Sequence, residues 1–154
     1  MFIISSKQKQ ENWNKIRELL ETIKQMQSDL QESASMFKAI FCVSPVAMLV
    51  VEVSSGVIID VNGAFEELSG RPRDSVVGRT VYETGLYDNP NQRSEIVAKI
   101  LDEGYVRHYP VSFMVKGEPT ECFLSSKLLQ RGGKKIMISV VDVAEIYQKR
   151  VNGE

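Results

Sequence analysis

The chain has 154 residues, of which 43% are hydrophobic and 25% charged, a composition typical of one globular domain with a sizeable core. Its formal net charge of −1 provides no basic field of the kind that nucleic acid or anionic lipid attracts. The two cysteines, Cys42 and Cys122, lack CxxC or zinc spacing, and the apolar opening at residues 1–4 is too short for a signal or a membrane span. We therefore expect a cytoplasmic protein that binds no nucleic acid and does not itself insert into a membrane.

Residues 9–41 contain no proline or glycine and predict a long amphipathic helix, which we take as an N-terminal segment covering residues 1–41. Apolar side chains recur in alternating steps of four and three, the heptad spacing of a coiled-coil seam. One member is polar, as in seams where such a residue sets the register. We expect a homodimer through this seam, and the alternative is a helix that folds back on its own domain. The seam residues are Ile16, Leu20, Ile23, Gln27, Leu30, Ala34, Phe37 and Phe41.

The helix is expected to end at Ser44-Pro45, because proline disfavours helical angles in the residue before it. Residues 46–53 are almost continuously apolar, and residues 57–61 form a second short apolar run. The Ser54-Ser55-Gly56 segment between them has the composition of a turn. This arrangement predicts a hairpin of two strands.

A short helix is predicted directly after the second strand. Asn62 has the position and chemistry of an N-cap, and Phe65 is one of the apolar residues that follow at helical spacing. Gly70 is placed to end the helix in a left-handed conformation. Asp74, which follows Pro72, predicts a second helix cap.

Two further helix starts occur before the next strands. Thr80 and Glu83 have capping-box spacing and predict a short helix. Asn89 is a good N-cap and Pro90 a good first helical residue, so a longer helix is expected to run to about residue 103. Its buried face is predicted to consist of Ile96, Val97, Ile100 and Leu101.

The remainder of the chain alternates between apolar and polar residues, which predicts three strands separated by turns at residues 116–118 and 131–134. These turns leave no room for crossover helices, so neighbouring strands must be antiparallel. We predict an α+β fold, a five-stranded antiparallel sheet with short helices on one face and the long helix before it. The domain is assigned to residues 42–144 and the start of a C-terminal linker helix to residues 145–154.

An ordered series of motifs gives the chain a resemblance to a known family. The series consists of Ser44-Pro45, Val61-Asn62-Gly63-Ala64-Phe65, Leu68-Ser69-Gly70, Val77-Gly78-Arg79 and Asp142-Val143. From about residue 37 to residue 146 the chain resembles a PAS domain of bacterial or archaeal signalling proteins. The resemblance implies a sensory module whose leader and exit helices carry a signal, and it implies a coupling role for Asp142 at the end of the last strand. A plain strand-end cap is the alternative for Asp142.

The sequence contains no recognisable catalytic constellation. His108 is the only histidine and has no phosphoacceptor box or triad partners, and we expect it to be a partly exposed strand residue. No cluster of ligand-type residues has metal spacing, and no phosphate-binding loop is present. We expect the acidic residues to be solvated surface groups or helix and turn caps. We expect a chain that is not an enzyme and has no metal site, and a small α+β enzyme is the least favoured alternative.

The resemblance also bears on cofactors. Flavin-binding members carry a reactive cysteine in the region that corresponds to residues 81–92, and haem-binding members carry a histidine on or near the long helix; this sequence has neither. The yellow-protein type of chromophore needs a cysteine in a similar region, and both Cys42 and Cys122 lie elsewhere. The cofactor is therefore unknown, and a pocket for a small apolar ligand or a filled core both remain open. The residues that would line the pocket are Met48, Val50, Phe65, Tyr82, Leu86, Ile96, Val97, Ile100, Phe113 and Leu124.

Together these features favour a non-catalytic PAS sensory and dimerisation module. Its expected partners are a second copy of the chain and a downstream output domain, in a histidine kinase, a diguanylate cyclase or a transcriptional regulator. The alternative is a domain whose main event is the binding of a small apolar ligand.

Overall fold

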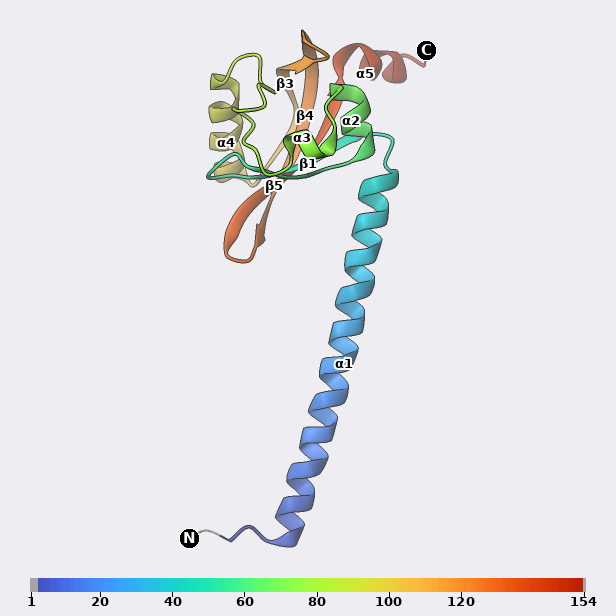
Figure 1. Ribbon diagram of the computed structural model, residues 1–154, viewed down its shortest axis with the longest axis vertical. Coiled ribbons are helices and arrows are strands. Elements are labelled where there is room, and N and C mark those ends of the chain that lie inside the picture. Colours follow the sequence, from blue (N-terminus) through green and yellow to red (C-terminus); the bar gives the residue numbers. More distant parts are fainter. Residues whose placement is uncertain (1–2, 154) are drawn as a thin grey trace. The chain divides into compact units, whose positions relative to one another are not determined.

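The computed structural model describes residues 3–153, so Met1 and Phe2 of the apolar opening lie outside the described part. Contacts within the chain divide it into two units, with the boundary between Ile40 and Phe41. The first unit is dominated by α1 (Ser6–Val43), one uninterrupted helix whose last residues belong to the second unit (Figure 1). Among the described residues, no helix combines the length and the apolarity needed to span a membrane.

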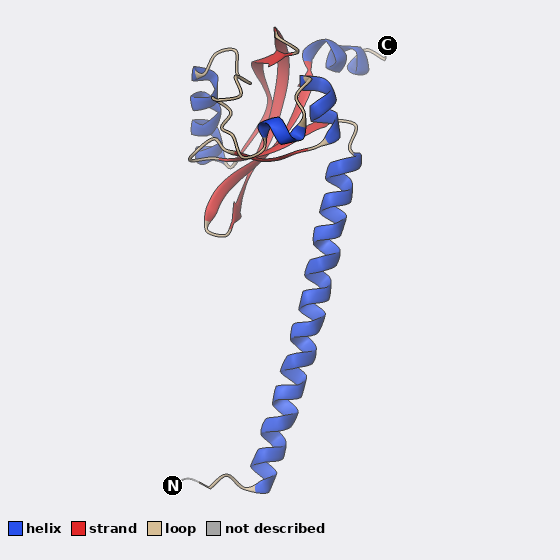
Figure 2. Ribbon diagram, viewed as in Figure 1, coloured by secondary structure: helices blue, strands red, loops and turns tan. Residues whose placement is uncertain are grey.

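The second unit contains a five-stranded sheet and four short helices (Figure 2). The strand order is β2-β1-β5-β4-β3, and every neighbouring pair is antiparallel, which confirms the predicted α+β fold class. The strands are β1 (Ala47–Glu52), β2 (Ile58–Val61), β3 (Tyr105–Val115), β4 (Glu118–Arg131) and β5 (Lys134–Val143). The helices are α2 (Gly63–Ser69), α3 (Arg73–Val76), α4 (Asn91–Glu103) and α5 (Ala144–Val151).

The main core lies between one face of the sheet and the helices α2, α3 and α4. Alternate residues of β1 point to opposite faces, as a pleated strand requires. Leu49 and Val51 therefore join the main core, whereas Val50 packs with Phe41 and Ile136 on the other face. We call this second face the outer face of the sheet. Phe41 was predicted to continue the coiled-coil seam, but it is only 3% exposed because the domain buries it.

Asn62 is the best-satisfied buried polar side chain of the domain. Its carbonyl oxygen accepts the N–H of Phe65 at 3.0 Å, which caps α2 as predicted, and also the N–H of Met48 at 2.9 Å. Its amide nitrogen donates to the carbonyl oxygens of Phe41 at 2.9 Å and Val46 at 3.0 Å. One side chain thus joins the last turn of α1, the entry into β1 and the start of α2. Burial of an amide is tolerated here because both of its N–H groups and its oxygen are bonded.

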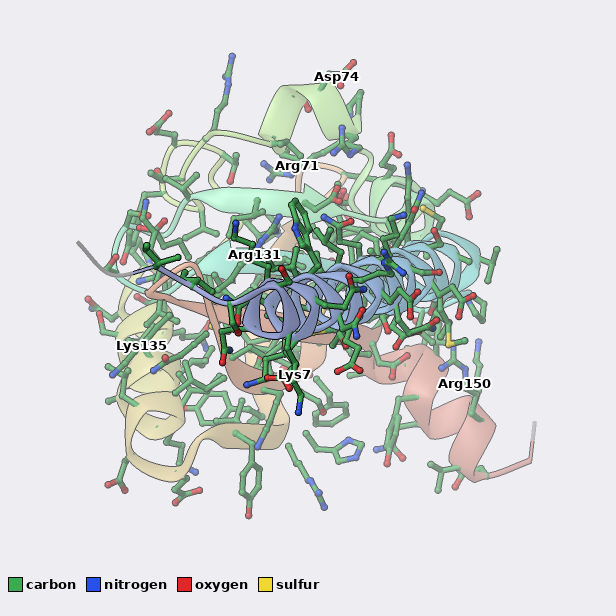
Figure 3. All side chains as sticks on the ribbon, turned by 90° about the horizontal axis from the view of Figure 1, so that it is seen from below. Lys7, Arg71, Asp74, Arg131, Lys135 and Arg150 are labelled. Carbon is green, nitrogen blue, oxygen red and sulfur yellow. The ribbon has the colours of Figure 1, made fainter. Side chains whose placement is uncertain are left out.

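Two predicted helix starts are wrong in detail. Asp74 lies inside α3, on its outer side (Figure 3), and Pro72 occupies the cap position without a side-chain hydrogen bond. Thr80 and Glu83 form the contacts of a capping box, with the Glu83 N–H donating to Thr80 Oγ1 at 3.0 Å. The chain at this point nevertheless forms only turns, because Gly85 follows within one helical turn.

The face of α4 also differs from the prediction. Ile96 and Ile100 are fully buried, Val97 is half-buried, and Leu101 is 47% exposed. Arg93 takes the place on the buried face that the prediction assigned to Leu101. Asn89 still helps to start the helix, since its Oδ1 accepts the N–H of Asn91 at 3.0 Å.

Replacing Asn62 with alanine should lower the free energy of unfolding by about 3 kcal/mol, because an N-cap is lost and buried backbone groups are left unpaired. The measurement is urea denaturation followed by circular dichroism. Asn89→Ala, which removes an exposed cap, is the matched control and should cost about 1 kcal/mol or less. Equal costs for the two variants would contradict the role given to Asn62.

Candidate functional site

The predicted pocket residues fall into three groups. The largest group is fully buried in the main core, where Phe65 from α2 meets side chains from α4 and from the strands. Each of these residues is at most 2% exposed. Val97 packs against the same cluster and is half-buried. The buried members are Phe65, Leu86, Ile96, Ile100, Phe113 and Leu124.

The other predicted pocket residues lie elsewhere. Met48 and Val50 belong to the cluster on the outer face of the sheet, together with Phe41, so they are not part of the same wall. The period of two along β1 made this separation readable from the sequence. Tyr82 is 50% exposed and its hydroxyl accepts a hydrogen bond from Arg93 Nη1 at 3.2 Å.

Arg93 is the functional candidate that the sequence interpretation did not include. Its side chain is 95% buried, and Nη2 donates to the carbonyl oxygens of Val53 at 2.8 Å and Glu52 at 3.4 Å. The only sequence signal was its spacing, since Arg93 lies three residues before Ile96 and seven before Ile100, on the same helix face.

Two further groups are held in their protonated forms by their surroundings. Burial raises the pKa of Tyr87 to about 12, while the nearby charge of Arg93 acts in the opposite direction. Burial likewise raises the pKa of Cys122 to about 11, so at neutral pH this residue is a thiol and not a nucleophilic thiolate. Within residues 3–153 no group of three or more His, Cys, Asp or Glu side chains is placed to hold a metal ion.

The exit from the domain is built around Asp142, near the end of β5. Its Oδ1 accepts a hydrogen bond from Arg150 Nη1 on α5 at 2.9 Å, and the pair is partly exposed. The ring of Tyr147 lies 5.3 Å from that of Phe123 and 5.1 Å from that of His108. Phe123 alternates with core residues along β4, so α5 contacts the outer face of the sheet.

His108 is exposed, as expected, and has an unusual backbone. Its φ of 47° coincides with a register shift between β3 and β4, and its N–H donates to Ser125 Oγ at 3.1 Å. Such a bulge re-aims a side chain, and here the ring is placed against Tyr147. The residue therefore takes part in positioning α5.

The seam of α1 is exposed along the first unit. The large apolar side chains are between 46% and 69% exposed, and the polar member of the seam and its alanine are exposed as well. These side chains are Ile16, Leu20, Ile23, Leu30 and Phe37, with Gln27 and Ala34 between them.

A family model described as the PAS fold matches residues 35–141, which is more than half of the chain. The chain belongs to the PAS family. No curated protein matches the sequence.

Solved structures give the same result for the fold. The PAS domain of an HTR-like protein from Haloarcula marismortui is 19% identical, with 78% of this chain and 98% of that chain covered and a TM-score of 0.58. A PAS domain from a two-component sensor histidine kinase is 10% identical, with coverage of 75% and 98% and a TM-score of 0.62. The PAS domain of a LuxR-family transcriptional regulator from Burkholderia thailandensis, in complex with ethanol, is 16% identical, with coverage of 71% and 97% and a TM-score of 0.58. The chain is therefore similar to PAS domains of sensor kinases and regulators.

Removing the ring of Tyr147 should loosen α5. Hydrogen exchange of the α5 amides is expected to become about tenfold faster in Tyr147→Ala, because two ring contacts with the sheet are lost. Arg150→Ala should accelerate exchange only about threefold, since its ion pair is partly exposed. Lys149→Ala, which breaks an exposed pair within the helix, is the control and should change exchange less than about twofold. The same rate in all three variants would show that the rings do not hold the helix.

Proposed function

We propose that this chain is a non-catalytic PAS sensory and dimerisation module of a signal-transduction protein. The protein to which it belongs is a histidine kinase, a diguanylate cyclase or a transcriptional regulator, and the module acts in the cytoplasm. In this role α1 forms a homodimer, residues 42–144 form the sensing domain, and the segment 145–154 leads toward an output domain. The free thiols of Cys42 and Cys122 agree with a reducing compartment.

The observation that supports the proposal most strongly is the exposed seam of α1. Large apolar side chains at heptad spacing along a single helix are typical of a two-stranded coiled coil, which buries them against a second copy. Trp13, 63% exposed, extends the same spacing by one step toward the N-terminus. Gln27 is the polar member that would set the register of the two helices.

Contacts at the two ends of the domain support a mechanical relay. Phe41, in the last turns of α1, packs on the outer face of the sheet, and Tyr147 of α5 packs on the same face. A change in the curvature or packing of the sheet would act on both attachments. A ligand shifts such an equilibrium only by the difference in its affinity for the two states.

Ligand binding as the main event is the second candidate. The solved PAS domain of the Burkholderia thailandensis regulator is in complex with ethanol, which shows that a small molecule can occupy a domain with this fold. The buried set around Phe65, Ile96 and Phe113 is the place in this chain where a small apolar molecule would replace core packing.

The dimer is tested by the variant Leu20→Glu/Ile23→Glu. Two charges on the seam should give a monomer, because burying a carboxylate against another apolar helix is costly. The mass in solution, measured by native mass spectrometry, should fall to that of one chain, whereas the circular dichroism and the melting of the domain should be unchanged.

The matched control is Thr22→Glu/Gln25→Glu, which adds the same two charges on the opposite side of α1. This variant should remain a dimer. A wild-type chain that is monomeric, or a seam variant that is still dimeric, would count against the proposal. Unfolding of the domain in the seam variant would mean that α1 folds back on it.

A further inference from the structure

A surface groove lies beside Arg93. The groove has a volume of about 830 Å³ and lies where α4 meets the end of β1 and the turn before β5. Its apolar lining comes from Val53, Val97 and Leu101. Two lysines lie at the β5 side, and Lys135 is seen beside α4 in Figure 3. Both the volume and the mixed lining are typical of small-molecule sites.

Arg93 carries a buried positive charge that no carboxylate balances. It forms no ion pair with an acidic side chain of the described chain, and its Nε has no hydrogen-bond partner there. Its other nitrogens bond to neutral groups, the carbonyl oxygens of Glu52 and Val53 and the hydroxyl of Tyr82. Buried charges in proteins are normally paired, because removing a charge from water is costly.

The nearest acid in the groove is already engaged. Glu52 Oε1 accepts from Ser54 Oγ at 3.0 Å, and Oε2 lies 3.5 Å from Lys134 Nζ. Hydrogen bonds from Ser54 and Ser55, followed by the charge of Lys134, hold the pKa of Glu52 below its ordinary value. The residues that line the groove include one acidic side chain, Glu52, and three basic ones, Arg93, Lys134 and Lys135. The groove therefore has an excess of positive charge.

The turn between β1 and β2 packs closely against Arg93 at Gly56. A Cβ at this position would lie 3.5 Å from the guanidinium carbon and 3.4 Å from the Tyr82 ring, and the φ of +76° already favours glycine. The guanidinium also lies over the Tyr82 ring, with 5.4 Å from its carbon to the ring centroid. The cation is thus fixed in position before any ligand arrives, which lowers the entropic cost of binding.

We propose that this groove binds a small organic carboxylate with an apolar body. The carboxylate lies toward Arg93 and the two lysines, which supply charge-assisted hydrogen bonds. The apolar part lies on Val97 and Leu101, which accounts for a leucine that α4 leaves half exposed. The inference rests on the sensory role proposed above and names the class of molecule that the module would sense.

Binding is measured by isothermal titration of the full chain with octanoate, and with octanamide, which has the same chain length and no charge. Octanoate should bind at least about tenfold more tightly than octanamide, because only the carboxylate balances the charge of the groove. In an NMR spectrum, octanoate should shift the amide signals of Val97, Leu101 and Gly133.

The decisive variant is Lys134→Gln/Lys135→Gln, since both lysines are exposed and their replacement should leave the fold intact. It should weaken octanoate binding about tenfold. The matched control, Lys99→Gln/Lys127→Gln, removes two exposed positive charges outside the groove and should change binding less than about twofold. Arg93→Gln should weaken octanoate binding more than either double variant does. Circular dichroism checks that this variant is folded.

Three results would overturn the inference. These are equal affinity for octanoate and octanamide, an unchanged affinity in Lys134→Gln/Lys135→Gln, and displacement of octanoate by inorganic phosphate at the same concentration. The last result would assign the groove to a phosphate. A chain that remains a dimer in native mass spectrometry but binds no octanoate would contradict this inference and leave the proposed dimerisation module standing.

Discussion

The four hydrogen bonds of Asn62 are the constraint on which the organisation of the domain depends. An amide side chain is tolerated in a core only when both of its N–H groups and its oxygen have partners. Here those partners come from Phe41, Val46, Met48 and Phe65. The end of α1, the first strand and the first short helix must therefore be in place together. A polar side chain in this position makes the arrangement specific, where an apolar one would only make it compact.

The two faces of the sheet have different roles. Its inner face carries the main core under α2, α3 and α4, which gives the domain its stability. Its outer face contacts Phe41 from the end of α1. The same face contacts Tyr147 of α5 through the ring of Phe123. Because the leading and the exit segments contact the same face, one sheet connects them without a separate linker. This is a physical basis for the relay proposed above.

Helix α4 illustrates how much a single rotation of a helix decides. Its sequence permits two buried faces beside Ile96 and Ile100. Arg93 lies three residues before Ile96, and Leu101 lies four residues after Val97. Hydropathy favours the face with the leucine. The structure adopts the face with the arginine, since carbonyl oxygens at the end of β1 and the hydroxyl of Tyr82 are available to receive the guanidinium. The exposed leucine and the buried cation are two consequences of the same choice.

Local signals in the sequence determined most of the elements. The Asn62 cap, the left-handed Gly70 and the turn at residues 131–134 follow from the chemistry of neighbouring residues, and the antiparallel sheet follows from turns too short for a crossover. The tertiary structure alone decided which residues share a surface. It buried Phe41 in the domain instead of the seam and put Arg93 beside the lysines of β5. These outcomes depend on contacts between segments far apart in the chain, and no local pattern records which distant groups will meet.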